Sequence, residues 1–354
     1  MKAPSPPCAD PANKKLLATL QGKAHWPPPL WLMRQAGRYL PEFKAIRAKA
    51  DFMTRCLTPD MAVELTLQPI KRYGMDGAIL FSDILILPWA LGQDLHFEEG
   101  RGPVLPPLRH EEDFRALDPA RVAERTAPVR EAITRLAREL ATTTTTLLGF
   151  AGAPFTVSCY MIEGGGSRDF AAVRRMMIKR PDLYAQLIEM LINATADMLS
   201  EQINAGAQAV MLFDSWAGIL PPNDFRRWVI EPTRRIRALL KQRHPTVPVI
   251  GFPRLGGVMT GEYAQNTGVD TVSLDTSTDP LKILPLLSPH QGVQGNLDPQ
   301  LLLNGGAPMV KAAQALAETL RGRSHVFNLG HGVSQFTPVE HVAELVEAVR
   351  SLSA

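Results

Sequence analysis

Two arginines, Arg34 and Arg38, are separated by three small or uncharged residues and directly follow a short apolar run. Guanidinium groups bind carboxylates and phosphates through paired hydrogen bonds, and Gly37 would let a large anion approach the backbone. The surrounding segment 34–55 contains six basic and two acidic residues, an excess of four positive charges, whereas the whole chain carries +3. We therefore expect this segment to bind an anion with several charges, with a solvated basic loop as the alternative.

Acidic residues end two other apolar runs. Asp83 follows the run at 78–81, and an isolated carboxylate in such a place costs free energy unless a donor binds it. Asp83 could bind a ligand, cap the next helix or form an ion pair with a nearby arginine. Asp214 follows the run at 209–213, and the next helix could use it as a cap.

Three further polar residues lie at or beyond the ends of such runs. Tyr160 could contact a ligand or could be a core aromatic whose hydroxyl needs a partner. Ser215 is equally suited to bind a ligand or to cap a helix. His331 lies between Gly330 and Gly332, and glycines suit both the close approach of a ligand and a tight turn.

Several common catalytic motifs are absent from the sequence. It contains no cluster of histidine and cysteine at metal-binding spacing, no P-loop and no GxSxG elbow. The three cysteines, Cys8, Cys56 and Cys159, include no CxxC pair and cannot form a dense disulfide framework.

The elements that position these residues follow from the apolar pattern. Continuous apolar runs suit strands buried on both faces of a parallel sheet. The predicted strands cover residues 30–33, 78–81, 146–150, 209–213, 247–252, 271–274, 292–295 and 325–329. The predicted helices, which alternate with the strands, cover residues 59–73, 111–140, 169–205 with a break at Pro181, 222–243, 308–321 and 338–352.

About eight strands alternating with helices predict an α/β fold, a single (β/α)8 TIM-type barrel. In such a barrel the carboxyl ends of the strands form one face, which would bring the polar residues above together. A doubly wound sheet is the structural rival, although no GxGxxG turn follows the first predicted strand. We expect one barrel domain over residues 14–354, after a short disordered, proline-rich tail over residues 1–13.

Composition excludes several classes of protein. Hydrophobic residues make up 45% and charged residues 21% of the 354 residues, as in globular proteins. A net charge of +3 is too small to predict nucleic-acid binding, and no run of 18 apolar residues predicts a membrane span. Because the N-terminus lacks the apolar core of a secretion signal, we expect a soluble, cytoplasmic protein that binds neither nucleic acid nor membrane.

Six strings closely resemble the uroporphyrinogen decarboxylase family and follow one another in the expected order. The resemblance runs from about residue 26 to residue 350, and its first and last strings are highly specific. The strings are WLMRQAGRYLPEF at 31–43, FSDIL at 81–85, GFAGAPFT at 149–156, YMIEGGG at 160–166, QGNLDP at 294–299 and FNLGHG at 327–332.

The resemblance implies an enzyme that removes the carboxyl groups of the four acetate side chains of uroporphyrinogen III. The products would be coproporphyrinogen III and four CO2, in porphyrin and haem biosynthesis. The small-molecule substrate is a flexible, non-aromatic ring with four inward N–H donors and eight peripheral carboxylates. The resemblance further implies a single (β/α)8 barrel, a homodimer, no metal and no organic cofactor.

Site residues are also implied by the resemblance. Asp83 would accept hydrogen bonds from the pyrrole N–H groups, and Asp83, Arg34 and Tyr160 would be the catalytic residues. The implied substrate contacts are Arg34, Gln35, Ala36, Gly37, Arg38, Arg47, Asp83, Tyr160, Ser215 and His331.

The chemistry of such a reaction gives these residues distinct tasks. Protonation of a pyrrole carbon would make a cationic ring that takes up electrons, so that no pyridoxal or thiamin is needed. The negative Asp83 would stabilise that cation. Arg34 is our hypothesis for the proton donor, although a guanidinium is a very weak acid in water; Tyr160 or a bound water is the rival donor.

Two loops depart from the family pattern. Residues 251–257 read GFPRLGG where many members have Phe-x-Lys-x-Gly-Gly, and residues 273–276 read SLDT where they have Gly-Leu-Asp-Trp.

Two other functions are alternatives to the decarboxylase. Zinc-dependent methyltransferases of the same superfamily are one rival, but Cys56 and Cys159 have no histidine at suitable spacing. A non-catalytic tetrapyrrole carrier is the other, disfavoured because simple binding needs no Asp83 opposite a basic rim.

Overall fold

The structure, a computed structural model, describes residues 14–353. The tail predicted for residues 1–13 lies outside the described residues. Within the described range the strands are β1 (Gly77–Ile79), β2 (His96–Glu98), β3 (Gly102–Val104), β4 (Thr146–Gly152), β5 (Ala209–Asp214), β6 (Val249–Pro253), β7 (Thr271–Ser273), β8 (Gly292–Gln294) and β9 (His325–Val326).

Helices occupy most of the segments between the strands. The first half of the described chain contains α1 (Lys15–Leu20), α2 (Pro41–Arg47), α3 (Phe52–Leu57), α4 (Pro59–Tyr73), α5 (Ile86–Leu91), α6 (Glu111–Arg115), α7 (Val122–Arg125), α8 (Ala127–Glu139), α9 (Pro154–Glu163) and α10 (Ala171–Lys179). The second half contains α11 (Pro181–Asn204), α12 (Pro222–Phe225), α13 (Glu231–Arg243), α14 (Met259–Thr267), α15 (Pro280–Ile283), α16 (Pro299–Asn304), α17 (Gly306–Thr319) and α18 (Val339–Arg350).

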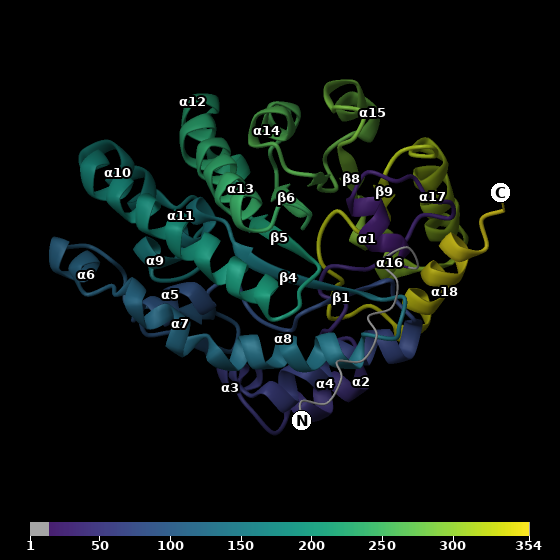
Figure 1. The fold of residues 1–354 in the computed structure, drawn as a ribbon, viewed down its shortest axis with the longest axis horizontal. Coiled ribbons are helices and arrows are strands. Elements are labelled where there is room, and N and C mark those ends of the chain that lie inside the picture. The colour runs from purple at the N-terminus through teal and green to yellow at the C-terminus, as the bar shows by residue number, and fades with distance from the viewer. Residues whose placement is uncertain (1–13, 354) are drawn as a thin grey trace, which may run out of the picture.

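Seven strands form one curled parallel sheet in the order β1-β4-β5-β6-β7-β8-β9. Figure 1 shows these strands at the centre of the molecule, with α8, α11, α13, α17 and α18 around them. Sheet order follows chain order without a reversal in the described part of the chain. The doubly wound alternative is therefore wrong, because that fold requires the strand order to reverse.

The strand predicted at residues 30–33 is wrong, because this segment forms only a single β-bridge, from Leu30 to Phe327. The segment still lies where another barrel strand would lie, since Asp76, just before β1, donates its N–H to the Leu30 carbonyl at 2.9 Å. The prolines at 27–29 explain the short pairing, because proline has no N–H to donate to a ladder. The sheet is consistent with a TIM-type barrel but contains seven strands instead of the expected eight.

The positions of the prolines explain which predicted helices are confirmed and which are wrong. The helix predicted at 59–73 is confirmed as α4, and the break at Pro181 is confirmed as the start of α11. The continuous helix predicted at 111–140 is wrong: it is divided into α6, a 3-10 turn, α7 and α8. Pro119 and Pro128 each occupy the first turn of one of these pieces, where a missing N–H costs nothing.

Apolar side chains fill both faces of the sheet, as its continuous apolar runs predict. Alternate residues along the strands point into the barrel and pack together, among them Leu148 and Phe150 of β4, Met211 and Phe213 of β5, and Ile250 and Phe252 of β6. Two larger clusters lie between the strands and the surrounding helices. The β2–β3 hairpin, which the sequence did not predict, lies outside this sheet.

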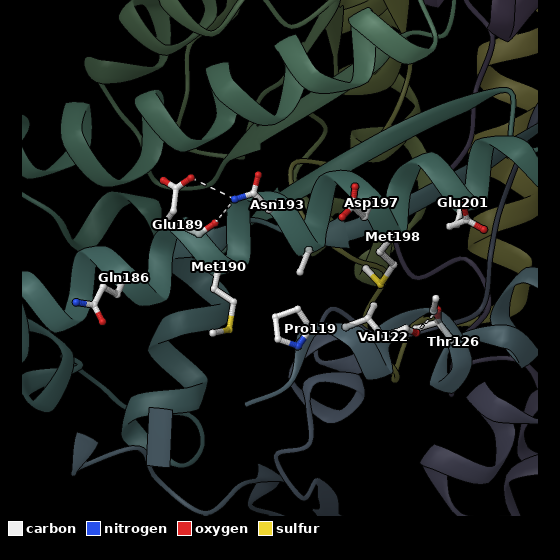
Figure 2. Close-up of a pocket in the computed structure, with 12 residues that line it drawn as sticks. Pro119, Val122, Thr126, Gln186, Glu189, Met190, Asn193, Asp197, Met198 and Glu201 are labelled. Carbon is white, nitrogen blue, oxygen red and sulfur yellow. Dashed lines mark hydrogen bonds between the residues drawn. The ribbon is translucent and has the colours of Figure 1, made fainter. Parts of the chain in front are cut away.

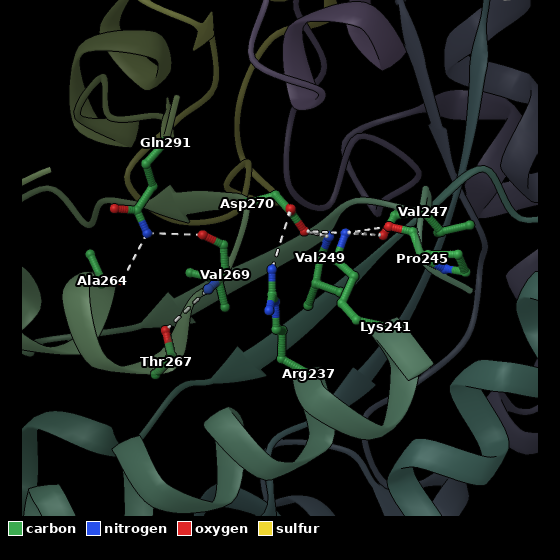
Figure 3. Close-up of polar contacts among 10 residues, drawn as sticks. All are labelled: Arg237, Lys241, Pro245, Val247, Val249, Ala264, Thr267, Val269, Asp270 and Gln291. Atoms are coloured by element: carbon green, nitrogen blue, oxygen red, sulfur yellow. Dashed lines mark hydrogen bonds and ion pairs between the residues drawn. The ribbon is translucent and has the colours of Figure 1, made fainter. Parts of the chain in front are cut away.

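A polar hub fixes the amino end of the sheet between α13, β6 and β7. The Asp270 carboxylate accepts from Val249 N at 2.7 Å and forms an ion pair with Lys241 at 3.0 Å, while Arg237 lies 4.0 Å away (Figure 3). The Gln291 amide donates to the carbonyls of Ala264 and Val269 beside this hub. With these strands held at one end, the loops at their carboxyl ends start from fixed positions.

Candidate active site

The candidate catalytic and binding residues gather at the carboxyl end of the sheet, where the ends of parallel strands meet. Arg34 follows the β-bridge segment, Asp83 follows β1, Tyr160 lies on α9 after β4, Ser215 follows β5, and His331 follows β9. Burial raises the pKa of Asp83 and lowers the pKa of His331. In both cases the positive charge of Arg34 lowers the pKa. Arg34 therefore lies within electrostatic reach of both residues.

Arg34 adopts a left-handed backbone conformation, with φ of 61°, which is uncommon for a residue other than glycine. Gln35 holds this turn: its Oε1 accepts from Leu32 N at 3.1 Å, and its Nε2 donates to Gly77 O at 2.8 Å. Its backbone N–H also donates to the Leu32 carbonyl, and its carbonyl accepts from the Tyr39 hydroxyl. The buried Gln35 thus shapes the turn, with its side chain and amide engaged within the protein.

The rest of the turn is open to an anion. The backbone N–H groups of Ala36 and Gly37 have no acceptor among residues 14–353, and successive free N–H groups form an anion-binding concavity. Arg38 is exposed and has no ion pair within the same range. Arg47, at the end of α2, has only a weak, exposed pair with Glu99 at 3.4 Å. The structure thus brings together the basic groups that the sequence singled out and leaves them available.

Arg55 is a buried member of this basic segment that the sequence reasoning did not place in the site. It is only 5% exposed, and its guanidinium lies over the rings of Phe43 and Phe52, 5.3 Å from each centroid. Burial lowers its pKa, and the charges of Arg47 and Arg38 lower it further. Its Nη1 has no hydrogen-bond partner in the described chain. Arg55 therefore adds positive potential beneath the exposed arginines without being neutralised by a carboxylate.

Asp83 has one bonded and one free carboxylate oxygen, and it is not the N-cap residue of α5. Its Oδ1 accepts from Leu85 N at 2.8 Å, just before α5, whereas its Oδ2 has no donor within the described residues. Burial raises the pKa of Asp83 to about 6, although the Leu85 N–H and the charge of Arg34 lower it. The side chain is partly exposed, so a ligand in the cleft can reach the free oxygen.

Tyr160 lies on α9, partly exposed, beside Trp216 and Phe170, with ring centroids 6.4 and 6.3 Å away. Burial raises the pKa of its hydroxyl, and the negative charge of Asp83 raises it as well. The hydroxyl is therefore protonated at neutral pH and serves best as a hydrogen-bond donor.

The position of Ser215 is fixed by its buried neighbour Asp214. Asp214 does not cap the next helix; its Oδ1 accepts from the Thr156 hydroxyl at 2.5 Å, and Thr156 Oγ1 accepts from Trp216 N at 3.0 Å. Burial raises the pKa of Asp214 to about 7. This chain of contacts joins the start of α9 to the loop after β5, and it leaves the partly exposed Ser215 hydroxyl without a partner in the described chain.

His331 is uncharged at neutral pH. Burial lowers its pKa to about 4, and the charges of Arg34 and Arg254 contribute in the same direction, while Asp275 opposes them. A neutral imidazole can donate one hydrogen bond and accept one, so His331 adds a polar contact to the cleft but no charge.

Apolar side chains lie at the carboxyl end of the sheet close to the candidate residues, which the sequence reasoning missed. Ile79, Phe150 and Phe213 point into the barrel from β1, β4 and β5 and remain partly exposed above its packed interior. The rings of Phe150 and Phe213 meet edge to face at 5.4 Å. Every-second-residue spacing along the strands was the available signal. The carboxyl end of the sheet thus offers partly exposed apolar side chains close to the charged residues.

A second hollow, a groove of about 450 Å³ between α7 and α11, lies away from these residues. Figure 2 shows the apolar residues that line it, Val122 of α7 and Met190 and Met198 of α11. The acidic residues Asp197 and Glu201 line it from α11 as well. Carboxylates here would repel the polyanion that the basic turn favours. We therefore assign the site to the strand ends.

The described residues contain no group of three or more His, Cys, Asp or Glu side chains arranged to hold a metal ion. Cys56 and Cys159 are both buried and unpaired, and burial raises their pKa values well above that of a free thiol. Thiols that stay protonated are poor zinc ligands. Within the described residues, no helix is long and apolar enough to cross a membrane.

The fold and the site together define a class of protein: an α/β enzyme with a curled parallel sheet whose carboxyl end carries a basic rim, partly exposed apolar side chains and one carboxylate. A family model described as uroporphyrinogen decarboxylase (URO-D) matches residues 11–352. The chain belongs to this family and is a decarboxylase, a carboxy-lyase.

Its relatives agree over nearly their full lengths. A protein named uroporphyrinogen decarboxylase from Gluconobacter oxydans (strain 621H) is 64% identical over 347 residues, covering 97% of this chain and 98% of the relative. One of the same name from Acidiphilium cryptum (strain JF-5) is 55% identical over 342 residues, covering 96% and 95%.

Solved structures share the fold at low sequence identity. A methyltransferase from Methanosarcina mazei is 20% identical, covers 95% of this chain and 98% of its own, and superposes with a TM-score of 0.78. A B12-independent methionine synthase from Shewanella sp. W3-18-1 is 12% identical, covers 82% and 85%, and gives a TM-score of 0.53. These likenesses support the architecture and carry no information about the reaction.

Proposed function

We propose that this chain removes the carboxyl groups of the four acetate arms of uroporphyrinogen III, giving coproporphyrinogen III and four CO2. The observation that carries the proposal is the free Oδ2 of Asp83, placed within electrostatic reach of the Arg34 turn and at the same end of the sheet as partly exposed apolar side chains. An inward-facing carboxylate suits the four N–H donors of a porphyrinogen, and an unneutralised basic rim suits its peripheral acids.

Each part of the site then has a binding task. Asp83 accepts hydrogen bonds from the pyrrole N–H groups, and Arg34, Arg38, Arg47 and the amides of Ala36 and Gly37 hold carboxylates. Gln35 keeps the turn in shape. Ser215, Tyr160 and His331 complete the substrate contacts from the other strand ends.

The chemical step uses the ring itself as the electron acceptor. A proton adds to the ring carbon next to the one that bears the acetate arm, and the pyrrole becomes cationic. The bond between the arm and its carboxylate then breaks, CO2 leaves, and the released electron pair forms an exocyclic double bond that neutralises the cation. A proton adds to the exocyclic carbon to make the methyl group, and the ring carbon loses its extra proton, so that one proton replaces each CO2.

Asp83 acts by holding negative charge beside the cation that forms. Because the charge is fixed in place and largely shielded from water, it stabilises the transition state more than an aqueous carboxylate would. No organic cofactor is required for this step, since the protonated ring accepts the electrons.

For the proton donor we propose Arg34, which lies within electrostatic reach of Asp83 and is fixed by its strained turn. Tyr160 is the rival, and burial raises the pKa of its hydroxyl. A bound water is the second rival. Tyr160→Phe separates these donors, since it removes the phenolic proton and keeps the ring. Turnover close to wild type would exclude Tyr160 as the donor, whereas loss of turnover with substrate binding retained would point to Tyr160 and away from Arg34.

An anaerobic assay tests the function itself. The purified chain is incubated with uroporphyrinogen III, and the oxidised products are separated by their number of carboxylates. We expect porphyrins with seven, six, five and finally four carboxylates. If the eight-carboxylate substrate is recovered unchanged while it binds the protein, the chain is a tetrapyrrole carrier and the decarboxylase proposal is wrong.

We also propose that two copies of the chain form a homodimer through the face that carries the cleft. Val258 in the loop after β6 is 92% exposed, and Phe336 in the loop after β9 is 75% exposed. Contiguous exposed apolar patches mark contact surfaces, and we propose that these two side chains belong to such a patch. Sedimentation should give a dimer mass, and Val258→Asp with Phe336→Asp should give the monomer.

We further propose that residues 14–354 make up one catalytic domain and that the enzyme works in the cytoplasm. Two buried, unpaired thiols, Cys56 and Cys159, fit a reducing compartment. The positive excess is concentrated in residues 34–55, which suits a small polycarboxylate and gives no extended footprint for nucleic acid.

A further inference from the structure

Arg254 occupies the carboxyl end of β6, in one of the two loops that depart from the family pattern. Its Nη1 donates to the carbonyl of Ser215 at 3.3 Å, so its guanidinium reaches the neighbouring strand end. Its backbone is held on both sides, since its N–H donates to Asp214 O and its carbonyl accepts from Gly218 N, both at 3.1 Å. The side chain is half-buried beside a residue of the candidate site.

The next residues hold this position under strain. Leu255 has a left-handed backbone with φ of 59°, and its N–H donates to the Asp275 carboxylate. A side chain at Gly218 would overlap the Leu255 backbone. A non-glycine residue in this conformation costs free energy, and here it directs the preceding arginine toward the loop after β5.

Asp275, whose carboxylate binds the N–H of the next residue, Leu255, does not form an ion pair with Arg254. Asp275 is 4% exposed, and its carboxylate is fully engaged by the loops around it. One oxygen accepts from Leu255 N, and the other accepts from Ser277 N, Ser277 Oγ and Thr278 Oγ1 at 2.7–2.9 Å. Within residues 14–353 Arg254 has no ion pair. It is therefore a half-buried cation with unused donors.

Arg254 lies at the carboxyl end of the sheet, as the basic turn does. Its charge acts on His331, as does that of Arg34. Arg34 follows the segment that bridges to Phe327 just after β9 and that also contacts Asp76 just before β1. Between this segment and β6 lie β1, β4 and β5 on one side and β7, β8 and β9 on the other, so Arg254 and Arg34 approach His331 from different parts of the sheet. A cation here would complete a positive rim that the segment 34–55 supplies on one side only.

We propose that Arg254 is a substrate-binding residue that holds a peripheral carboxylate of the porphyrinogen on the side of the cleft opposite the Arg34 turn. This inference rests on the proposed function, because it assumes a ligand with carboxylates all round its ring. Its unused N–H groups bind the carboxylate, while Nη1 keeps its contact with the Ser215 carbonyl.

The main rival is a purely structural role, in which Arg254 only braces the Ser215 carbonyl. Arg254→Gln and Arg254→Lys separate the two roles, because both side chains can donate to that carbonyl and only lysine carries charge. Arg323 provides a matched control: it is half-buried, donates to the carbonyls of Ser288 and Gln291 and has no ion pair in the described chain, but it lies at the amino end of β9.

The measurement is the steady-state rate with uroporphyrinogen III under anaerobic conditions, together with calorimetric binding of coproporphyrinogen III. We expect Arg254→Gln to raise KM and Kd about tenfold, the effect of losing one charge-assisted hydrogen-bonded contact. Its kcat should stay within about threefold, since a rim contact binds ground state and transition state alike. Arg254→Lys should recover most of the loss, and Arg323→Gln should behave as wild type.

Two outcomes would overturn the proposal. Unchanged KM and Kd in Arg254→Gln would show that no carboxylate depends on the charge. Equal impairment in Arg254→Gln and Arg254→Lys would show that the shape of the arginine, and not its charge, matters. If the wild-type chain binds coproporphyrinogen III but has no turnover, the proposed function fails, while the binding comparison still decides the role of Arg254.

Discussion

The side chain of Arg34 lies directly on the backbone of Gly332. A Cβ added to Gly332 would overlap Arg34 Cδ and would lie 2.6 Å from its Cγ and 3.0 Å from its Nε. Neither Gly330 nor Gly332 has a positive φ, so a tight turn does not require these two glycines. The glycine after His331 therefore allows the Arg34 side chain to approach the loop after β9.

Gly332→Ala should therefore impair the site without unfolding the protein. The added methyl group must displace the Arg34 side chain, and a displacement of about 1 Å at a catalytic group costs about 100-fold in rate. We expect kcat/KM to fall by about that factor, with a thermal midpoint close to wild type.

A double-mutant cycle checks the cause of this loss. Arg34→Ala removes the atoms that the new methyl group would strike, so Gly332→Ala should have little further effect in that background. If the two losses multiply independently, Gly332 acts through another contact and the relationship with Arg34 is not functional.

The activity should depend on the ionisation of Asp83. Because burial raises its pKa to about 6, this carboxyl keeps its proton to higher pH than an ordinary aspartate. The active form is the anion, so kcat/KM should fall as the pH drops through about 6. A pH profile from 4.5 to 8.5 measures this limb, and a rate that stays constant down to pH 5 would argue against an ionised Asp83 in the reaction.

Arg55→Met should weaken substrate binding without lowering the stability of the protein. Methionine keeps the packing against Phe43 and Phe52 but removes a buried charge that lacks a carboxylate partner. The free energy of unfolding should stay constant or rise by about 1 kcal/mol, whereas KM for the polyanionic substrate should rise several-fold. Urea denaturation and steady-state kinetics test the two effects, and a large loss of stability would show that Arg55 is mainly a structural residue.

Thr156→Val should destabilise the loop that presents Ser215. The substitution preserves shape but removes the hydroxyl that donates to Asp214 and accepts from Trp216 N. Leaving these buried groups without partners should cost about 1–3 kcal/mol of unfolding free energy. Thr195→Val is a matched control, since the Thr195 hydroxyl is buried and has no hydrogen-bond partner in the described chain; an equal cost in both variants would contradict the prediction.

Much of the fold was predictable from local patterns. Long apolar runs became β4, β5 and β6 because both faces of a parallel strand are buried, and Gly74, with φ of 64°, ends α4 where predicted. The failures arose where proline acted on the backbone: at 27–29 it shortens an expected strand to a bridge, and at Pro119 and Pro128 it divides an expected helix.

The site was predictable in its charges but not in its packing. Arg34, Arg38 and Asp83 stand out by charge in apolar surroundings. The functions of Gly332 and Arg254 depend on contacts between loops that are far apart in the sequence, and no local pattern encodes those contacts.

The most direct test of the central claim is anaerobic turnover of uroporphyrinogen III by Asp83→Asn. Asparagine has nearly the same shape and still accepts a hydrogen bond from Leu85 N, but it carries no charge. We predict a folded protein that binds coproporphyrinogen III and loses turnover by about 100- to 1,000-fold. Turnover within a few-fold of wild type would contradict the claim that the Asp83 charge stabilises the cationic ring.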